Sequence, residues 1–160
     1  MCGKSGSGKT RNVVMPVVSK IPVQRLYVVD ANYEYRNLPA GHRIIPAYYS
    51  AEWLDSFILE FRRKHVNCCL VIEDLDMFSP RQSEELIRLS VNCRHQNIGL
   101  VLVSRRILGL PKVLVMKVTY MAIFRGLSVE DKDYLTEINP DFETLAFPTE
   151  DFKYILIENA

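Results

Sequence analysis

The sequence predicts an α/β fold built around a mostly parallel sheet, and three observations lead to that prediction. Short runs rich in β-branched and apolar residues alternate with amphipathic stretches of helical length, the pattern of strand–helix–strand units. Two of the runs, Cys68–Ile72 and residues 98–103, are apolar almost throughout, as strands buried on both faces of a sheet are. At 160 residues, with no repeat and no linker, the chain is expected to form one domain over residues 1–160.

The expected elements follow one another along the chain. A helix over residues 9–20 comes first, then a strand at 23–30, a short strand at 43–47, and a helix from a cap at Ser50 to His65. After Cys68–Ile72 the pattern predicts a helix over 81–94, the strand 98–103 and a strand at 119–124. Ser128 and Asp131 resemble a capping box that opens a helix to Glu137, and residues 152–157 are predicted to be a terminal strand.

Composition narrows the class of protein. The chain is 48% hydrophobic and carries a net charge of +1, so no overall basic field points to nucleic acid, and any DNA contact must come from a local patch or a ring of subunits. The four cysteines form no Cys-x-x-Cys pair and are expected to be buried free thiols. No apolar run approaches the roughly 18 residues of a membrane span, and no signal peptide is visible. We therefore expect a cytoplasmic protein that is not an integral membrane protein.

The first eight residues after Cys2 form a phosphate-binding pattern. They fit G-x-x-x-x-G-K-[ST] at every fixed position, as Gly3, Lys4, Ser5, Gly6, Ser7, Gly8, Lys9 and Thr10. Glycines let the backbone curl so that its N–H groups converge on phosphate oxygens, and the N-terminus of the next helix adds positive partial charge. Lys9 is expected to reach the β- and γ-phosphates, and the Thr10 hydroxyl to ligate Mg²⁺. The motif predicts a P-loop, or Walker A motif.

A matching acidic motif follows the apolar run that ends at Ile72. Glu73 and Asp74 are expected at the sheet edge beside the P-loop, one acid serving Mg²⁺ and the other orienting the attacking water. ATPases of this kind usually place Asp before Glu, and here the order is reversed. Two assignments stay open: Glu73 takes the metal role and Asp74 the water role, or Asp74 and Asp76 share them. No Asn-Lys-x-Asp guanine-reading motif is present, so ATP is the expected nucleotide.

The start of the chain departs from the usual P-loop arrangement. Only Met1 and Cys2 precede Gly3, whereas a P-loop ordinarily follows a buried strand. The first, central strand is therefore expected to be missing, or to lie upstream of Met1 in an N-terminally truncated domain. The alternative is a domain that borrows or omits this strand.

Three further segments resemble the FtsK/HerA superfamily of ATPases. Residues 28–35 (VVDANYEY) look like the HerA segment Asp-Pro-x-Gly-Glu-Tyr that follows the second strand. Residues 94–106 (RHQNIGLVLVSRR) resemble the FtsK segment Gly-Arg-Ala-x-Gly-Ile-His, followed by an apolar strand and Ala-Thr-Gln-Arg. Leu110-Pro111 and residues 122–125 (AIFR) resemble the stretch before the last strands. Within the superfamily, the chain is similar to the small DNA-packaging ATPases of viruses and related mobile elements.

The resemblance implies a three-layer, RecA-like (ASCE) P-loop NTPase that forms a homohexameric ring and moves double-stranded DNA through its central hole. It also implies a location in the host cytoplasm or the virion, with a capsid or membrane protein as a candidate partner. Arg94 matches the family's arginine after the Walker B helix, a candidate for contacting a neighbour's γ-phosphate. Arg105 stands where the family usually has a sensing Gln, and arginine cannot accept a hydrogen bond to orient water.

Other functions compete with a DNA-translocating motor. One is a P-loop kinase or a helicase-like ATPase, although two carboxylates argue against a small-molecule kinase, in which the second substrate replaces the water. Another is a nucleotide-dependent switch with little hydrolysis, which the reversed Glu73-Asp74 order and the absent Gln favour. Oligomeric state separates the motor from the kinase, and measured turnover separates it from the switch.

Four tyrosines are candidates either for stacking on a nucleobase or for packing: Tyr33, Tyr35, Tyr48 and Tyr49.

Overall fold

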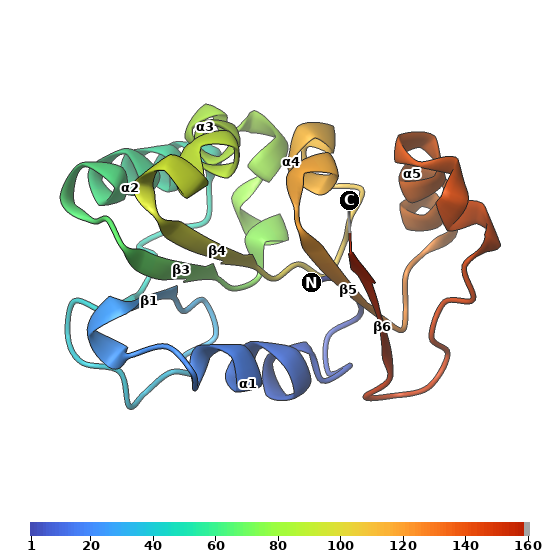
Figure 1. The fold of residues 1–160 in the computed structure, drawn as a ribbon, viewed down its shortest axis with the longest axis horizontal. Coiled ribbons are helices and arrows are strands. Elements are labelled where there is room, and N and C mark those ends of the chain that lie inside the picture. Colours follow the sequence, from blue (N-terminus) through green and yellow to red (C-terminus); the bar gives the residue numbers. More distant parts are fainter. Residues whose placement is uncertain (159–160) are drawn as a thin grey trace.

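The computed structural model describes residues 1–158 and shows helices on both sides of a layer of strands (Figure 1). Four strands form a parallel sheet in the order β2-β1-β3-β4, and two form an antiparallel pair, β5-β6. Figure 1 shows α2, α3 and α4 on one side of the strands and α1 on the other, with α5 beyond β6. The predicted α/β, three-layer fold with a mostly parallel sheet is confirmed.

The strands of the four-stranded sheet are short and parallel. They are β1 (Leu26–Val29), β2 (Arg43–Ile44), β3 (Cys68–Ile72) and β4 (Ile98–Leu102). β3 lies between β1 and β4, with Val29 opposite Ile72 and Ile72 opposite Leu102. All five residues of β3 are buried, and its two cysteines belong to apolar clusters on opposite faces. This register brings the carboxyl ends of β1, β3 and β4 to one edge of the sheet.

The second group of strands is joined to the first through the start of the chain. β5 (Tyr120–Phe124) pairs antiparallel with β6 (Tyr154–Glu158). Cys2 forms parallel bridges to Ser104, just after β4, and to Ile123 of β5. Residues 1 and 2 thus lie where the last residues of a central strand would lie. Beside them, β4 and β5 border a mainly apolar cavity of about 480 Å³.

Two helices begin at the caps that the sequence indicates. α2 (Ala51–Lys64) starts at Ser50, whose hydroxyl accepts from the Trp53 N–H. α5 (Val129–Ile138) opens on the predicted capping box of Ser128 and Asp131. α3 (Glu84–Asn92) is shorter than the predicted 81–94, because 3₁₀ turns at Pro80–Gln82 and Cys93–Gln96 flank it.

Two helical segments differ from the prediction. The helix expected over 9–20 is a π-helical turn, Thr10–Val14, followed by the short α1 (Met15–Val18). α4 (Lys112–Lys117) was not predicted, because a six-residue helix directly after Pro111 leaves little periodic signal. Within residues 1–158, no helix is long and apolar enough to cross a membrane.

Candidate nucleotide-binding site

The P-loop emerges between β4 and β5 and leads into the π-helical turn. Gly3 has a φ of 137°, and a Cβ there would approach the Phe124 Cβ to 2.7 Å, so the backbone needs glycine at this close approach. Lys4 is fixed by its N–H, which donates to the Arg125 carbonyl at 3.0 Å. The loop therefore owes its curved path to both its glycines and its packing on the end of β5.

Lys9 lies folded into the P-loop. Its ammonium Nζ donates to the Gly3 carbonyl at 2.6 Å and to the Lys4 carbonyl at 3.0 Å. Burial lowers the pKa of Lys9, and the charge of Asp74 acts in the opposite direction. The Ser7 hydroxyl is buried and has no hydrogen-bond partner within residues 1–158. The loop thus holds a buried cation and an unsatisfied hydroxyl, a combination that suits phosphate oxygens.

Glu73 follows β3 and faces the start of the π-helical turn. Its Oε1 accepts from the Thr10 hydroxyl at 3.4 Å and from the Tyr35 hydroxyl at 2.6 Å. The side chain is buried, which raises the pKa of Glu73 to about 7, and the Tyr35 hydrogen bond opposes that increase. A hydroxyl and a carboxylate this close fit Mg²⁺, which proteins commonly bind through one or two carboxylates together with phosphate oxygens and water.

Asp74 lies at the same edge in a left-handed backbone conformation, with φ 46°. Its Oδ2 accepts from the Asn32 amide at 2.6 Å. A cavity of about 210 Å³ opens between the P-loop and the two acids. It is lined by Ser5, Gly6, Gly8, Lys9, Thr10, Arg11, Asn32, Glu34, Glu73 and Asp74. The structure therefore brings the two predicted motifs to one hollow.

The segment after β1 holds both acids in place through Asn32 and Tyr35. These contacts were not predicted from the sequence. Asp30 is fully buried, and its carboxylate accepts from the N–H groups of Glu34 and Tyr35 at 2.9 and 3.0 Å and from Arg43 at 2.7 Å. These bonds fix the turn that carries Asn32 and Tyr35. Because β1 and β3 are parallel neighbours, polar residues directly after β1 were the available signal for this part of the site.

The tyrosines proposed for base stacking have other surroundings. Tyr35 is buried with its hydroxyl on Glu73, so it does not present a free ring face. The Tyr49 hydroxyl donates to the Ala31 carbonyl at 3.1 Å, and Tyr33 lies under the Arg43 guanidinium. Neither they nor Tyr48 line the 210 Å³ cavity.

Asp76 and Arg105 pair with each other outside this cavity. The Arg105 guanidinium donates to Asp76 Oδ2 from Nε at 3.0 Å, and its backbone N–H donates to Oδ1 at 2.9 Å. Ser104 donates to the same Oδ1 at 3.2 Å. Asp76 is thus occupied, and the geometry favours the Glu73 and Asp74 assignment over the one that uses Asp76.

Arg94 lies far along the sheet from these residues. It belongs to the 3₁₀ turn that precedes β4, and its Nη2 donates to the Thr119 hydroxyl at 3.0 Å. Since β3 and β4 are parallel, the amino end of β4 lies opposite the edge that carries Glu73. Arg94 is therefore not placed to serve the P-loop of its own subunit.

Comparison with solved structures places the fold. The chain superposes on the genome packaging NTPase B204 from Sulfolobus turreted icosahedral virus 2, in complex with ATP-gammaS, with a TM-score of 0.75 and 12% identity over 99% of this chain and 90% of that one. It is also similar to ATPases 2 and 3 of EssC from Geobacillus thermodenitrificans, with a TM-score of 0.59 and 12% identity over 99% and 37% of the two chains. The N-terminal domain of zonular occludens toxin from Neisseria meningitidis matches with a TM-score of 0.54 and 15% identity over 81% and 77%.

No protein-family model matches the chain, and no curated protein shows significant sequence similarity to it. The structural matches define the class: the chain has the fold of P-loop NTPases. That is the fold which the resemblance to FtsK/HerA ATPases implied.

The burial of Glu73 predicts a pH-dependent change in stability. Folding raises the pKa of the Glu73 carboxyl from 4.5 to about 7, so the folded state is most stable when this carboxyl is protonated. Its contribution to the free energy of unfolding is fully present below pH 4.5 and is lost as pH rises through 7. Glu73→Gln keeps an acceptor for Tyr35 and removes the charge. We expect the nucleotide-free variant to be more stable than the unmodified chain at pH 8, by about 3 kcal/mol, and the difference to shrink toward pH 5.

Urea unfolding across this pH range measures the effect. Glu143→Gln, at an exposed carboxylate, is the matched control and is expected to change little. An unchanged or lower stability of Glu73→Gln at pH 8 would contradict the buried, unfavourable charge.

Proposed function

We propose that this chain is an ATPase that uses ATP and Mg²⁺ to translocate double-stranded DNA, as in genome packaging. The observation that supports the proposal is the single hollow in which Lys9, Thr10, Glu73 and Asp74 converge. P-loop NTPases use a lysine, a hydroxyl and acidic side chains in these positions. The similarity of fold to a viral genome packaging NTPase is the reason for proposing DNA as the cargo.

Nucleotide binding would begin with the P-loop. The N–H groups of Lys4 and Ser7 already donate to the Arg125 and Lys4 carbonyls, so the N–H groups of residues 5, 6 and 8 and the N-terminus of the π-helical turn receive the phosphates. Lys9 exchanges its two loop carbonyls for phosphate oxygens, and Ser7 gains the hydrogen-bond partner that it lacks. Thr10 and Glu73 would hold Mg²⁺, which supplies charge neutralisation at the β- and γ-phosphates when bound.

Hydrolysis would depend on Asp74 and its support. Asp74 lines the hollow, and its carboxylate would orient and deprotonate a water there. Asn32 donates to one oxygen of Asp74 and leaves the other available. Tyr35 does the same for Glu73, so the segment after β1 positions each acid for a separate role.

A DNA-translocating motor requires several subunits to assemble. With a net charge of +1, one subunit offers no overall basic field to DNA, and a ring would have to present one. We propose a homohexameric ring in the host cytoplasm or on the virion, with a capsid or membrane protein as a candidate partner. Arg94, at the edge away from its own P-loop, is the proposed cation for the neighbouring subunit's γ-phosphate.

A nucleotide-dependent switch is the second candidate function. The observation that favours it is that Arg105, which stands where FtsK/HerA ATPases usually have a sensing Gln, offers no amide and is paired with Asp76. In the motor, we propose that Arg105 turns toward phosphate from this position. A switch would bind ATP as the motor does and hydrolyse it slowly, with or without DNA.

The first prediction of the proposed function concerns ATP hydrolysis and its coupling to DNA. ATP turnover by the assembled protein is expected to rise when linear double-stranded DNA is added. Asp74→Asn is expected to slow turnover by about 10²-fold or more while leaving ATP binding nearly intact, because it removes the general base. Asp76→Asn is the matched control and should retain most of the activity. DNA-independent turnover would contradict the motor, and slow turnover throughout would favour the switch.

The second prediction tests Arg94 across the subunit boundary. Arg94→Ala leaves the P-loop intact, and Lys9→Ala leaves the arginine intact, so each variant alone should be inactive. Mixed rings should recover activity at interfaces that pair an intact P-loop with an intact Arg94. An arginine supplied by a partner contributes about 10³–10⁵ in rate where it has been isolated. Mixed rings that form and stay inactive would show that Arg94 does not act between subunits.

A further inference from the structure

An aromatic ring lies against the P-loop, outside the 210 Å³ cavity that the acids line. Phe152 precedes β6, and a Cβ added at Gly8 would approach its ring carbon Cδ1 to 2.7 Å. The residue is nevertheless 55% exposed. One part of Phe152 therefore touches the loop that holds the phosphates, while the rest faces solvent beside it.

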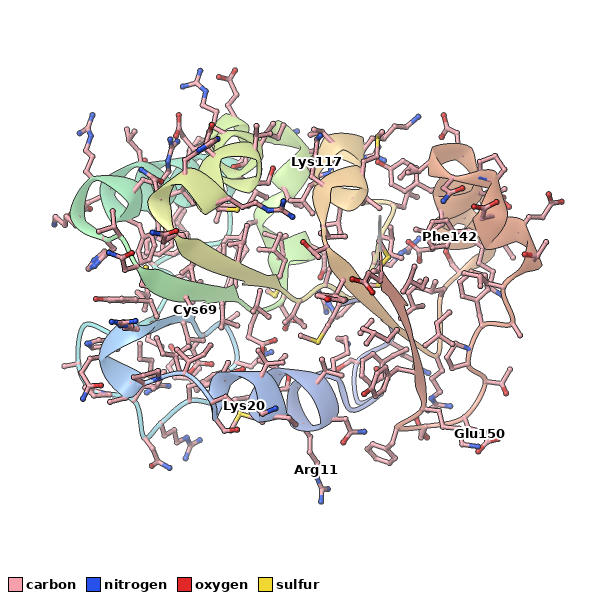
Figure 2. The ribbon with its side chains drawn as sticks, in the orientation of Figure 1. Arg11, Lys20, Cys69, Lys117, Phe142 and Glu150 are labelled. Carbon is pink, nitrogen blue, oxygen red and sulfur yellow. The ribbon has the colours of Figure 1, made fainter. Side chains whose placement is uncertain are left out.

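The backbone fixes Phe152 in this place. Its φ is 63°, a left-handed conformation that bulky residues rarely adopt. The Asn12 side chain, from the π-helical turn after the P-loop, donates to the Phe152 carbonyl at 3.1 Å. Ion pairs of Asp151 with Arg125 and of Glu150 with Lys153 hold the same turn. Figure 2 shows Glu150 on this turn, on the same side of the molecule as Arg11 of the π-helical turn.

The direction of a bound nucleotide follows from the two ends of the site. Thr10 and Glu73 lie on the β3 side, so the metal-bound β- and γ-phosphates would point toward β3. The P-loop itself emerges between β4 and β5. The α-phosphate, ribose and base would then extend away from β3, toward β5 and β6. Phe152 lies on that side.

We propose that Phe152 stacks on the nucleobase of the bound nucleotide. The inference rests on the proposed function, since it needs a nucleoside triphosphate in the P-loop. A half-exposed phenyl ring fixed beside the loop offers one open face to a flat, aromatic ligand. Stacking tolerates every base, so Phe152 would add affinity for nucleotides without selecting strongly among them. Tyr33, the other exposed ring considered for stacking, already has the Arg43 guanidinium over one face.

The experiment compares a ligand that carries a base with one that has only the phosphates. Dissociation constants of Mg²⁺-ATP and of Mg²⁺-tripolyphosphate are measured on the assembled protein and on Phe152→Ala. Loss of one base–aromatic stack is expected to weaken ATP binding about tenfold. Tripolyphosphate binding should not change, because it has no base to stack. Tyr33→Ala is the matched control and should bind both ligands as the unmodified chain does.

Phe152→Trp supplies a direct readout. It should restore ATP affinity, and its emission should be quenched by ATP and not by tripolyphosphate, above the constant background of Trp53, the one natural tryptophan. Equal weakening of both ligands by Phe152→Ala would show that the ring only supports the loop, and unchanged ATP affinity would show that it does not meet the base; either result overturns the inference. If the unmodified chain binds neither ligand, the proposed function itself fails.

Discussion

The parallel register of β1, β3 and β4 is the constraint on which the candidate site depends. Parallel neighbours end at the same edge, so Asp30 after β1, Glu73 after β3 and Ser104 after β4 are brought level with the P-loop. Cys2 completes the alignment by bridging to the residue after β4 and to β5. A shift of β3 by one residue would turn Glu73 away from Thr10, because successive strand residues point to opposite faces.

The site is arranged at a cost in stability that the proposed function would explain. Glu73 is held in a buried position that raises its pKa to about 7, and Asp74 occupies a left-handed backbone conformation. Asp30, although fully buried, is compensated by Arg43 and two backbone N–H groups. Glu73 and Asp74 accept hydrogen bonds from neutral groups, and they would meet metal or water, whereas Asp30, which is paired with a cation, only shapes the turn. Perturbed groups that gather in one hollow are typical of a functional site.

The sequence predicted the parts of the site that are local in the chain. Residues 3–10 and the pair Glu73-Asp74 are recognisable because their roles follow from contiguous motifs. Asn32 and Phe152 could not be assigned in this way, since only tertiary folding brings them to Asp74 and Gly8. The choice between the pair Glu73 and Asp74 and the pair Asp74 and Asp76 was also open. The structure favours the first pair, because Asp76 is hydrogen-bonded to Arg105. Among the helices, those with Ser caps were predicted, whereas the short α4 was not.

The central proposal is that Thr10 and Glu73 form the metal position of a nucleotide site. A crystal structure with ATP-gammaS and Mn²⁺ in place of Mg²⁺ tests this, because the anomalous signal of manganese locates the ion. We expect one strong peak within coordination distance of Thr10 Oγ1 and near Glu73, beside the β- and γ-phosphates, with Lys9 Nζ moved from the Gly3 carbonyl to phosphate. A peak between Asp74 and Asp76, or a nucleotide bound outside the P-loop, would contradict it.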